Sequence, residues 1–350
     1  MAYTTINKAK EHFTPFTYTG TGSATTKTGV GFTPDLAWGK NTDVGQSWWS
    51  IDQIRGNSYY LPLNSTNMQN NDVGNFGITT DGLTFPNGDQ FFNGSGHLHG
   101  SWLWKGAGSS SSNTDGTITA NVNANPTAGF SIIDFTGTEA SGSVGHGLGA
   151  EPSCFVMRRY TDDGYASTSE WYVYHKSVGG SNYLRFNGNN GQTTNDGTLW
   201  NTSTPVTSSV INIGSNANSN HSGNKTIIYA WVEKPGYSKF GKYTGNGGNQ
   251  FIYTGFKPSF FLLKSYNQLV NWKLMDNKRD PHNPVEGTLN LNTQDVEDDN
   301  AAYAMDFVSN GVMLRNGNAN MNQPGGSYSY VYMAFGQTLV GSNNVPCTAR

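Results

Sequence analysis

Few side chains in this sequence are spaced to do chemistry. His97 and His99 flank Leu98, and on a strand they would share one face, a spacing that can bind zinc. No third ligand stands nearby, so the pair is interpreted as structural. The acidic run at residues 295–299 could supply oxygens to calcium, but it lacks the alternation and the glycine of a dedicated calcium loop. A solvated loop is the simpler interpretation, and we predict no metal or other cofactor.

Glycoside hydrolysis would require two carboxylates facing each other across a sugar bond. Asp52 and Asp276 each follow a tryptophan at matched places in the sequence, and His175 takes that place between them. Neither aspartate has an evident acidic partner on its own strand, and the chain has no Gly-x-Ser-x-Gly motif for an activated serine. We therefore expect a protein that is not an enzyme and has no catalytic residues. A glycan-degrading enzyme remains the third alternative.

Aromatic rings could bind a ligand by covering the apolar face of a sugar. The tryptophans recur at one landmark, as Trp48 or Trp49, Trp171 and Trp272, which indicates equivalent core positions. Aromatic residues that occur in only one part of the chain are better candidates for ligand contact. These candidates are Tyr59, Tyr165 and Tyr266.

The composition favours a globular protein with many short strands. Charged residues make up only 13% of the chain, while glycine accounts for 44 of 350 residues and aromatic residues for 13%. A disordered chain would be rich in charge and poor in aromatic residues. Turn formers mixed with aromatic and β-branched residues instead indicate strands joined by tight turns. The net charge of −3 argues against nucleic acid as a partner and suits uncharged polar ligands such as sugars.

An internal repeat organises the chain. An aromatic-Thr-Gly triplet begins at Tyr18, Phe135 and Tyr243, and each copy leads to a glycine-rich turn and a proline. An apolar segment, the tryptophan segment, a leucine-rich segment, a short strand and a final aromatic strand follow in the same order each time. The final strands contain residues 101–104, 228–231 and 330–335. Seven landmarks in one order predict three copies of a single structural unit.

Alternation of residue types predicts the fold class. In Trp171-Tyr172-Val173-Tyr174, successive side chains would point to opposite faces of a sheet, one to pack and one to meet solvent. Six or seven such segments per unit, without long amphipathic helices between them, predict an all-β protein. The expected architecture is three tandem antiparallel β-sandwich units of the jelly-roll or lectin-like kind.

Composition also suggests where the units begin and end. We expect repeat 1 at residues 1–106, repeat 2 at 129–236, repeat 3 at 237–336 and a C-terminal tail at 337–350. Residues 107–128, which include a run of four serines, are predicted to be a flexible linker. No apolar stretch at the amino terminus indicates a signal peptide, and no run is long enough to insert in a membrane. Synthesis in a cytoplasm is therefore expected.

Several segments together resemble the virion proteins of marine bacteriophages that infect cyanobacteria and abundant marine heterotrophs. The resemblance covers the opening residues 1–8, the repeated triplet units, the junction at residues 236–241 and the ending at residues 339–343. It implies a lectin-like β fold at the virion surface, in a tail fibre, an appendage or a capsid decoration. The implied partners are other virion proteins and a host surface glycan, with a homo-oligomer, guessed to be a trimer. A carbohydrate-binding module without a virion role is the main alternative.

Overall fold

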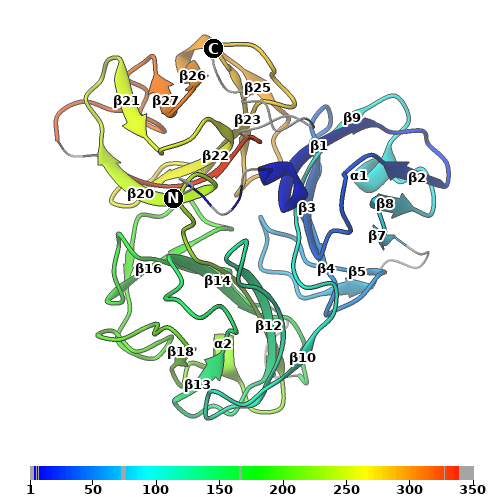
Figure 1. Ribbon diagram of the computed structural model, residues 1–350, viewed down its shortest axis with the longest axis vertical. Coiled ribbons are helices and arrows are strands. Elements are labelled where there is room, and N and C mark those ends of the chain that lie inside the picture. The colour runs from blue at the N-terminus through cyan, green and yellow to red at the C-terminus, as the bar shows by residue number, and fades with distance from the viewer. Residues whose placement is uncertain are drawn as a thin grey trace.

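The protein is built from three lobes around a common centre (Figure 1). The computed structural model describes residues 4, 6, 8–71, 76–164, 168–326 and 328–338. Almost all regular elements in these ranges are strands, and the strands that pair within the sheets run antiparallel. The predicted all-β, antiparallel fold class is confirmed.

Lobe 1 contains a main sheet with the order β1-β9-β3-β4 and an outer sheet with the order β2-β8-β7. A two-stranded ribbon, β5-β6, and a one-turn helix complete it. Its elements are η1 (Ala9–Glu11), β1 (Phe13–Thr19), β2 (Thr25–Thr28), β3 (Leu36–Asn41), β4 (Trp49–Asp52), β5 (Tyr59–Tyr60), β6 (Asn70–Asn71), β7 (Gly77–Thr79), β8 (Gly82–Phe85), α1 (Gln90–Asn93) and β9 (Leu98–Trp104).

Lobe 2 has a main sheet of eight strands in the order β10-β11-β12-β19-β14-β15-β16-β17 and an outer pair, β13-β18. Its elements are β10 (Ser111–Asn113), β11 (Ala120–Asn125), β12 (Phe130–Thr136), β13 (Gly142–Gly145), β14 (Cys154–Arg159), β15 (Tyr172–His175), β16 (Asn182–Arg185), β17 (Thr193–Thr194), β18 (Val210–Ile213), α2 (Ala217–Asn220) and β19 (Lys225–Trp231).

Lobe 3 has a main sheet in the order β20-β28-β22-β23-β24-β25 and an outer sheet in the order β21-β27-β26. Its elements are β20 (Ser238–Thr244), β21 (Gln250–Tyr253), β22 (Pro258–Ser265), β23 (Lys273–Asp276), β24 (Gly287–Asn290), β25 (Asp298–Asp299), η2 (Ala301–Tyr303), β26 (Met305–Val308), β27 (Gly311–Leu314) and β28 (Ser329–Gly336).

One order of strand pairing is common to the three lobes. The last strand of each lobe lies between the first and third strands of the repeat, which in lobe 2 are counted from β12, as in β1-β9-β3, β12-β19-β14 and β20-β28-β22. The aromatic-Thr-Gly triplets end the first strands at Gly20, Gly137 and Gly245. A Cβ at any of these glycines would overlap a carbonyl oxygen of the turn that precedes the last strand. Close backbone contact therefore explains why the triplet ends in glycine.

The central strands are buried on both faces, which differs from the expected pattern of one packed and one solvated face. In β19, Tyr229 and Trp231 belong to the core at the centre of the molecule, while Ile228 and Ala230 belong to the core of lobe 2. Trp171, Tyr172, Val173 and Tyr174 are likewise all buried, with exposures of 0–6%. The alternation was correctly read as a strand, but it separates two cores because each main sheet lies between two layers.

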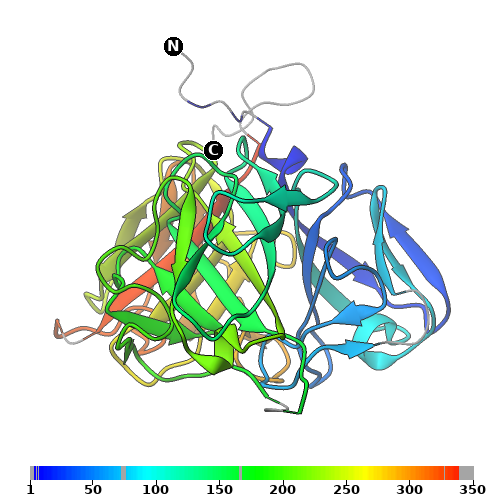
Figure 2. The same cartoon turned by 90° about the horizontal axis from the view of Figure 1, so that it is seen from below.

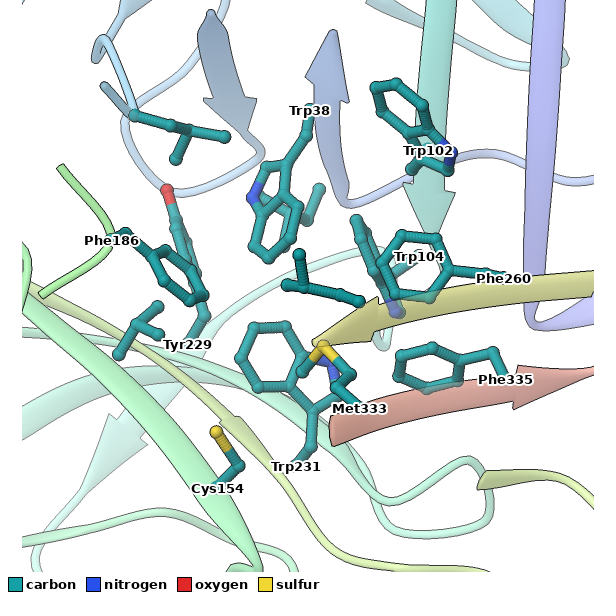
Figure 3. Packing of buried hydrophobic residues seen from close by; sticks show 14 of the residues in the cluster. Trp38, Trp102, Trp104, Cys154, Phe186, Tyr229, Trp231, Phe260, Met333 and Phe335 are labelled. Carbon is teal, nitrogen blue, oxygen red and sulfur yellow. The ribbon is translucent and has the colours of Figure 1, made fainter. Parts of the chain in front are cut away.

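The central core joins the three lobes into one body. Figure 3 shows Trp38 and Trp104 of lobe 1, Trp231 of lobe 2 and Phe335 of lobe 3 converging in this core. Each lobe also has an outer core between its main and outer sheets. Because so much aromatic surface is shared at the centre, burial of that surface stabilises the whole assembly rather than single lobes.

The predicted linker at residues 107–128 is wrong. This segment contains β10 and β11, and β11 pairs with β12 over six residues, from Ala120↔Phe135 to Asn125↔Phe130. Ala120 and Val122 are buried in the core of lobe 2, and the amide of Asn123 hydrogen-bonds to Asp35 of lobe 1 at 2.7 Å. Apolar residues alternate from Ile118 to Ala124, and this period outweighs the polar, serine-rich composition.

The first and the last regular elements, η1 and β28, approach each other at one end of the molecule (Figure 2). In Figure 2, η1 and the last residues of β28 are together, and α1 is at the opposite end. The backbone N–H of Lys10 donates to the hydroxyl of Thr338 at 3.2 Å, which links the two terminal segments. None of the described helices has the length and the apolar character needed to cross a membrane.

Candidate functional site

The recurring tryptophans fasten each lobe to a neighbour. All three are buried in the central core, and each indole N–H donates to a backbone carbonyl of another lobe. The bonds close a ring: Trp48 to Asn290 at 2.9 Å, Trp171 to Pro62 at 2.8 Å and Trp272 to Arg185 at 2.7 Å. A buried indole N–H requires an acceptor, and here the acceptor lies across the seam between two lobes. These rings are therefore structural.

A buried cation reinforces each seam. Lys40, Arg158 and Lys264 occupy matched positions on the third strands of their lobes, since each lies four residues after the partner of the last-strand aromatic. Each side chain donates to backbone carbonyls of a neighbouring lobe. Lys40 reaches Gln294 of lobe 3, and Lys264 reaches Asn189 of lobe 2. Arg158 reaches three carbonyls of lobe 1, those of Pro62, Ser65 and Asn67.

The seam cations interact with carbonyls that bear no formal charge. Burial lowers the pKa of Lys264 to about 7 and that of Lys40 to about 8. The guanidinium of Arg158 also loses solvation by burial, which lowers its pKa to about 9 and still leaves it charged at neutral pH. The hydrogen bonds to carbonyl oxygens offset part of the cost of burying each cation.

The matched acids also join lobes. Asp52 forms a fully buried ion pair with Arg55 at 2.5 Å and accepts a hydrogen bond from the Tyr229 hydroxyl of lobe 2 at 2.7 Å. Asp276 pairs with Arg279 at 2.6 Å and accepts from the indole of Trp102 in lobe 1 at 3.2 Å. The two carboxylates thus belong to separate seams and are occupied by structural partners.

The matched position in lobe 2 holds a neutral base. A ring nitrogen of His175 lies 3.2 Å from the carbonyl oxygen of Tyr332 in lobe 3. Burial lowers the pKa of His175 to about 4, so the ring is uncharged at neutral pH. On the last strand of lobe 3, Met333 occupies the position that Trp102 and Tyr229 occupy in the other lobes. Unlike the indole N–H and the phenol O–H at those positions, its thioether has no hydrogen to donate to a carboxylate.

The sequence motifs that suggested metal ions have other roles. His99 is buried and stacks on Tyr18, with 4.9 Å between ring centroids, and burial lowers its pKa to about 4. Within the acidic run, Glu297 forms an ion pair with Arg279 at 2.5 Å. In the residues that the structure describes, no group of three or more His, Cys, Asp and Glu side chains could hold a metal ion.

A solvent-open cleft in lobe 1 combines aromatic and amide side chains. It has a volume of about 410 Å³, within the usual ~300–1,000 Å³ of small-molecule sites. The segments around β5 and β6, the residues before β4 and the helix α1 form its walls. The lining residues are Gln46, Ser47, Tyr60, Pro62, Asn67, Asn70, Asn71, Asp89, Phe91 and Phe92.

One wall of the cleft is aromatic and is held by the start of α1. The carboxylate of Asp89 caps this helix by accepting from the N–H of Phe91 at 2.7 Å. The ring centroid of Phe91 lies 5.2 Å from that of Tyr60 and 4.4 Å from that of Phe92. Tyr60 and Phe91 are half-buried, so each ring is anchored on one side and reachable on another.

The other wall is rich in amides, and contacts from all three lobes fix its backbone. Lys40 of lobe 1 donates to the carbonyl of Gln46 at 2.6 Å, and Arg158 of lobe 2 donates to that of Asn67. The hydroxyl of Ser47 accepts from the side chain of Gln294 in lobe 3 at 2.9 Å. The seam cations therefore position the cleft as well as the lobes.

The predicted ligand-contact tyrosines fall in three different places. Tyr59 lies on β5 with 37% of its surface exposed and is not among the cleft residues, which include its neighbour Tyr60 instead. Tyr266 packs against the central core at the seam between lobes 2 and 3, where its carbonyl accepts from the N–H of Gln192. Tyr165 lies outside the described residues.

Sequence reasoning missed the cleft residues Tyr60 and Phe91. A signal for Phe91 does exist in the repeat. The turn before the last strand reads Asp89-Gln-Phe-Phe-Asn93 in lobe 1, and the same turn is 216–220 in lobe 2 and 318–322 in lobe 3. Asn218 and Asn320 replace Phe91 there, so the aromatic residue is peculiar to lobe 1.

Comparison with known proteins places the chain in a family without assigning it an activity. A search of the curated proteins found no relative. Residues 8–338 match a family model described as a domain of unknown function, DUF7483. The match includes all three lobes, so the unit of this family is the whole three-lobed body. The chain belongs to the DUF7483 family.

Proposed function

We propose that this protein is a non-enzymatic structural protein on the surface of a bacteriophage particle, in a tail fibre, an appendage or a capsid decoration. Its resemblance to marine phage virion proteins suggests the setting. Its partners would be other virion proteins on one side and the host surface on the other. This assignment goes beyond family membership, which carries no function of its own.

The observation that carries the proposal is the closed ring of seams. Three indole bonds, three buried cations and two buried Asp–Arg pairs hold the lobes around one core. A body built in this way resists deformation, because separating any two lobes breaks these bonds and exposes the apolar surface of the shared core to water. Such rigidity suits a protein that must keep its shape outside a cell.

The location of η1 and of the end of β28 supports an orientation on the particle. These two elements, linked by the bond between Lys10 and Thr338, mark the terminal end, and the cleft-forming helix α1 lies at the other end (Figure 2). Attachment through the terminal end would leave the cleft exposed to the surroundings. In this orientation, other virion proteins contact the terminal end and the host contacts the opposite end.

Cryo-electron microscopy of intact particles, together with mass spectrometry of purified virions, tests the proposal. We expect the polypeptide in the virions, with its terminal end toward the particle. A few copies on the tail would indicate host recognition, and many copies on the capsid lattice would indicate decoration. Particles that lack the polypeptide would refute the virion role.

A further inference from the structure

We infer that the cleft of lobe 1 binds a neutral saccharide, with a sugar ring against Tyr60 and Phe91 and its hydroxyls hydrogen-bonded by the surrounding amides. This site deepens the proposed function by naming the host-surface partner. The binding itself can be tested without particles, so the two proposals can fail separately.

The aromatic wall supplies the surface that a sugar ring packs on. A pyranose presents C–H groups on a face, and an aromatic ring presents its electron-rich face to such groups. Tyr60 and Phe91 are half-buried, and Phe92 behind them is almost fully buried in the core of lobe 1. Phe91 contacts both of the other rings, so little side-chain freedom is lost on binding.

The amide wall supplies hydrogen bonds for the hydroxyls. Gln46, Asn67, Asn70 and Asn71 each carry one acceptor and two donor hydrogens, which match hydroxyl groups that both donate and accept. Among the hydrogen bonds formed within the described residues, none uses the side-chain amide of Gln46 or Asn71. The ligand can therefore engage these amides without breaking an existing contact.

Charge in the cleft selects against acidic ligands. Among the described residues of the lining, Asp89 is the one that is charged, and its carboxylate is exposed. None of these described lining residues is a lysine, arginine or histidine. Phosphate, sulfate or carboxylate groups would meet a like charge without a compensating cation. A neutral sugar avoids this cost, and the free oxygen of a carboxylate is a strong acceptor for a sugar hydroxyl.

Comparison with the other lobes indicates that the aromatic wall is not needed for folding. The capped turn at 89–93 recurs at 216–220 and 318–322, with N–H donors at Asn218 and Asn320 bonded to the side chains of Asn216 and Asn318 at 2.9 and 2.8 Å. Those turns form with asparagine where lobe 1 has Phe91. The turn therefore does not require the phenylalanine, which packs on Tyr60 and Phe92 and keeps part of its ring exposed for a ligand.

The test uses the purified full chain on an array of neutral hexose-containing oligosaccharides together with sialylated and sulfated ones. We expect selective binding of neutral glycans. Phe91→Asn, which copies the turns of lobes 2 and 3, and Asn71→Ala should each weaken binding at least tenfold. The matched control Asn190→Ala, at an exposed amide of lobe 2, should bind as the unchanged protein does. Circular dichroism confirms that each variant is folded.

Three results would overturn the inference: no binding to any neutral glycan, a preference for acidic glycans, or unchanged binding by folded Phe91→Asn. Each of these leaves the virion role standing if the polypeptide is present in particles. Conversely, selective neutral-glycan binding by a protein that is missing from virions would support the cleft and refute the virion role.

Discussion

The seams between the lobes and the capped turns at the rims of the lobes, residues 89–93, 216–220 and 318–322, differ in how far their residues repeat from lobe to lobe. At the seams, an indole donor and a buried cation recur in every lobe, and only the acid position changes, to His175 in lobe 2. At the rim turns, the cap and the buried asparagines Asn93, Asn220 and Asn322 recur, yet the residue between them changes from Phe91 to asparagine. Residues that recur in all three lobes are therefore those that the fold requires, whereas Phe91, which occurs in lobe 1 alone, indicates a role of that lobe.

Removing a seam tryptophan should give the largest effect. Trp171→Ala deletes a fully buried ring and one of the two hydrogen bonds to the carbonyl of Pro62, which keeps its bond from Arg158, so the free energy of unfolding should fall by about 3–5 kcal/mol. Chemical denaturation should show one transition for all three lobes, because they share the central core. Trp171→Phe keeps most of the ring and should cost about 1–2 kcal/mol. Separate transitions for single lobes would contradict the shared core.

Low pH should weaken the seam between lobes 2 and 3, where His175 lies. The pKa of His175 is lowered to about 4 by burial, whereas an unfolded histidine titrates near 6.5. Between these values the unfolded chain binds more protons, so stability is present above pH 6.5 and falls as pH decreases toward 4, by up to about 3 kcal/mol. Denaturation of His175→Gln across this range should show a weaker pH dependence. An equal slope in both proteins would contradict the assignment.

Replacing Phe91 by the asparagine found in the matching turns of lobes 2 and 3 should affect glycan binding more than stability. Phe91→Asn removes a half-buried ring but keeps the capped turn, so the free energy of unfolding should fall by about 1–2 kcal/mol. The reverse change, Asn218→Phe, should be tolerated in lobe 2. Thermal unfolding measures both, and a loss of folding in Phe91→Asn would show that this ring is structural after all.

The smallest effect is expected at Tyr59. Its ring is exposed and lies outside the cleft lining, so Tyr59→Ala should change stability by less than about 0.5 kcal/mol and leave glycan binding unaltered. Isothermal titration with a glycan selected on the array would measure the binding. Weakened binding in this variant would extend the site beyond the cleft.

Local patterns in the sequence predicted the strands well. Period-two alternation predicted β15, the repeat predicted β19 as the closing aromatic strand of its unit, and the triplets at Tyr18, Phe135 and Tyr243 mark the ends of β1, β12 and β20. The same rule applied to residues 118–124 would have predicted β11, where composition misled us. These signals are readable because a strand's own side chains report the two faces of its sheet.

The seams and the cleft could be found only in the tertiary structure. Lys40, Arg158 and Lys264 read as ordinary surface cations in apolar strands, since nothing in their neighbourhood in the chain shows what they contact. Their partners are backbone carbonyls, which every residue possesses, so the acceptors leave no trace in the sequence. The cleft likewise combines residues 46–47, 60–71 and 89–92. The sequence alone determined which segments become strands, and packing around the shared core determined which of them meet.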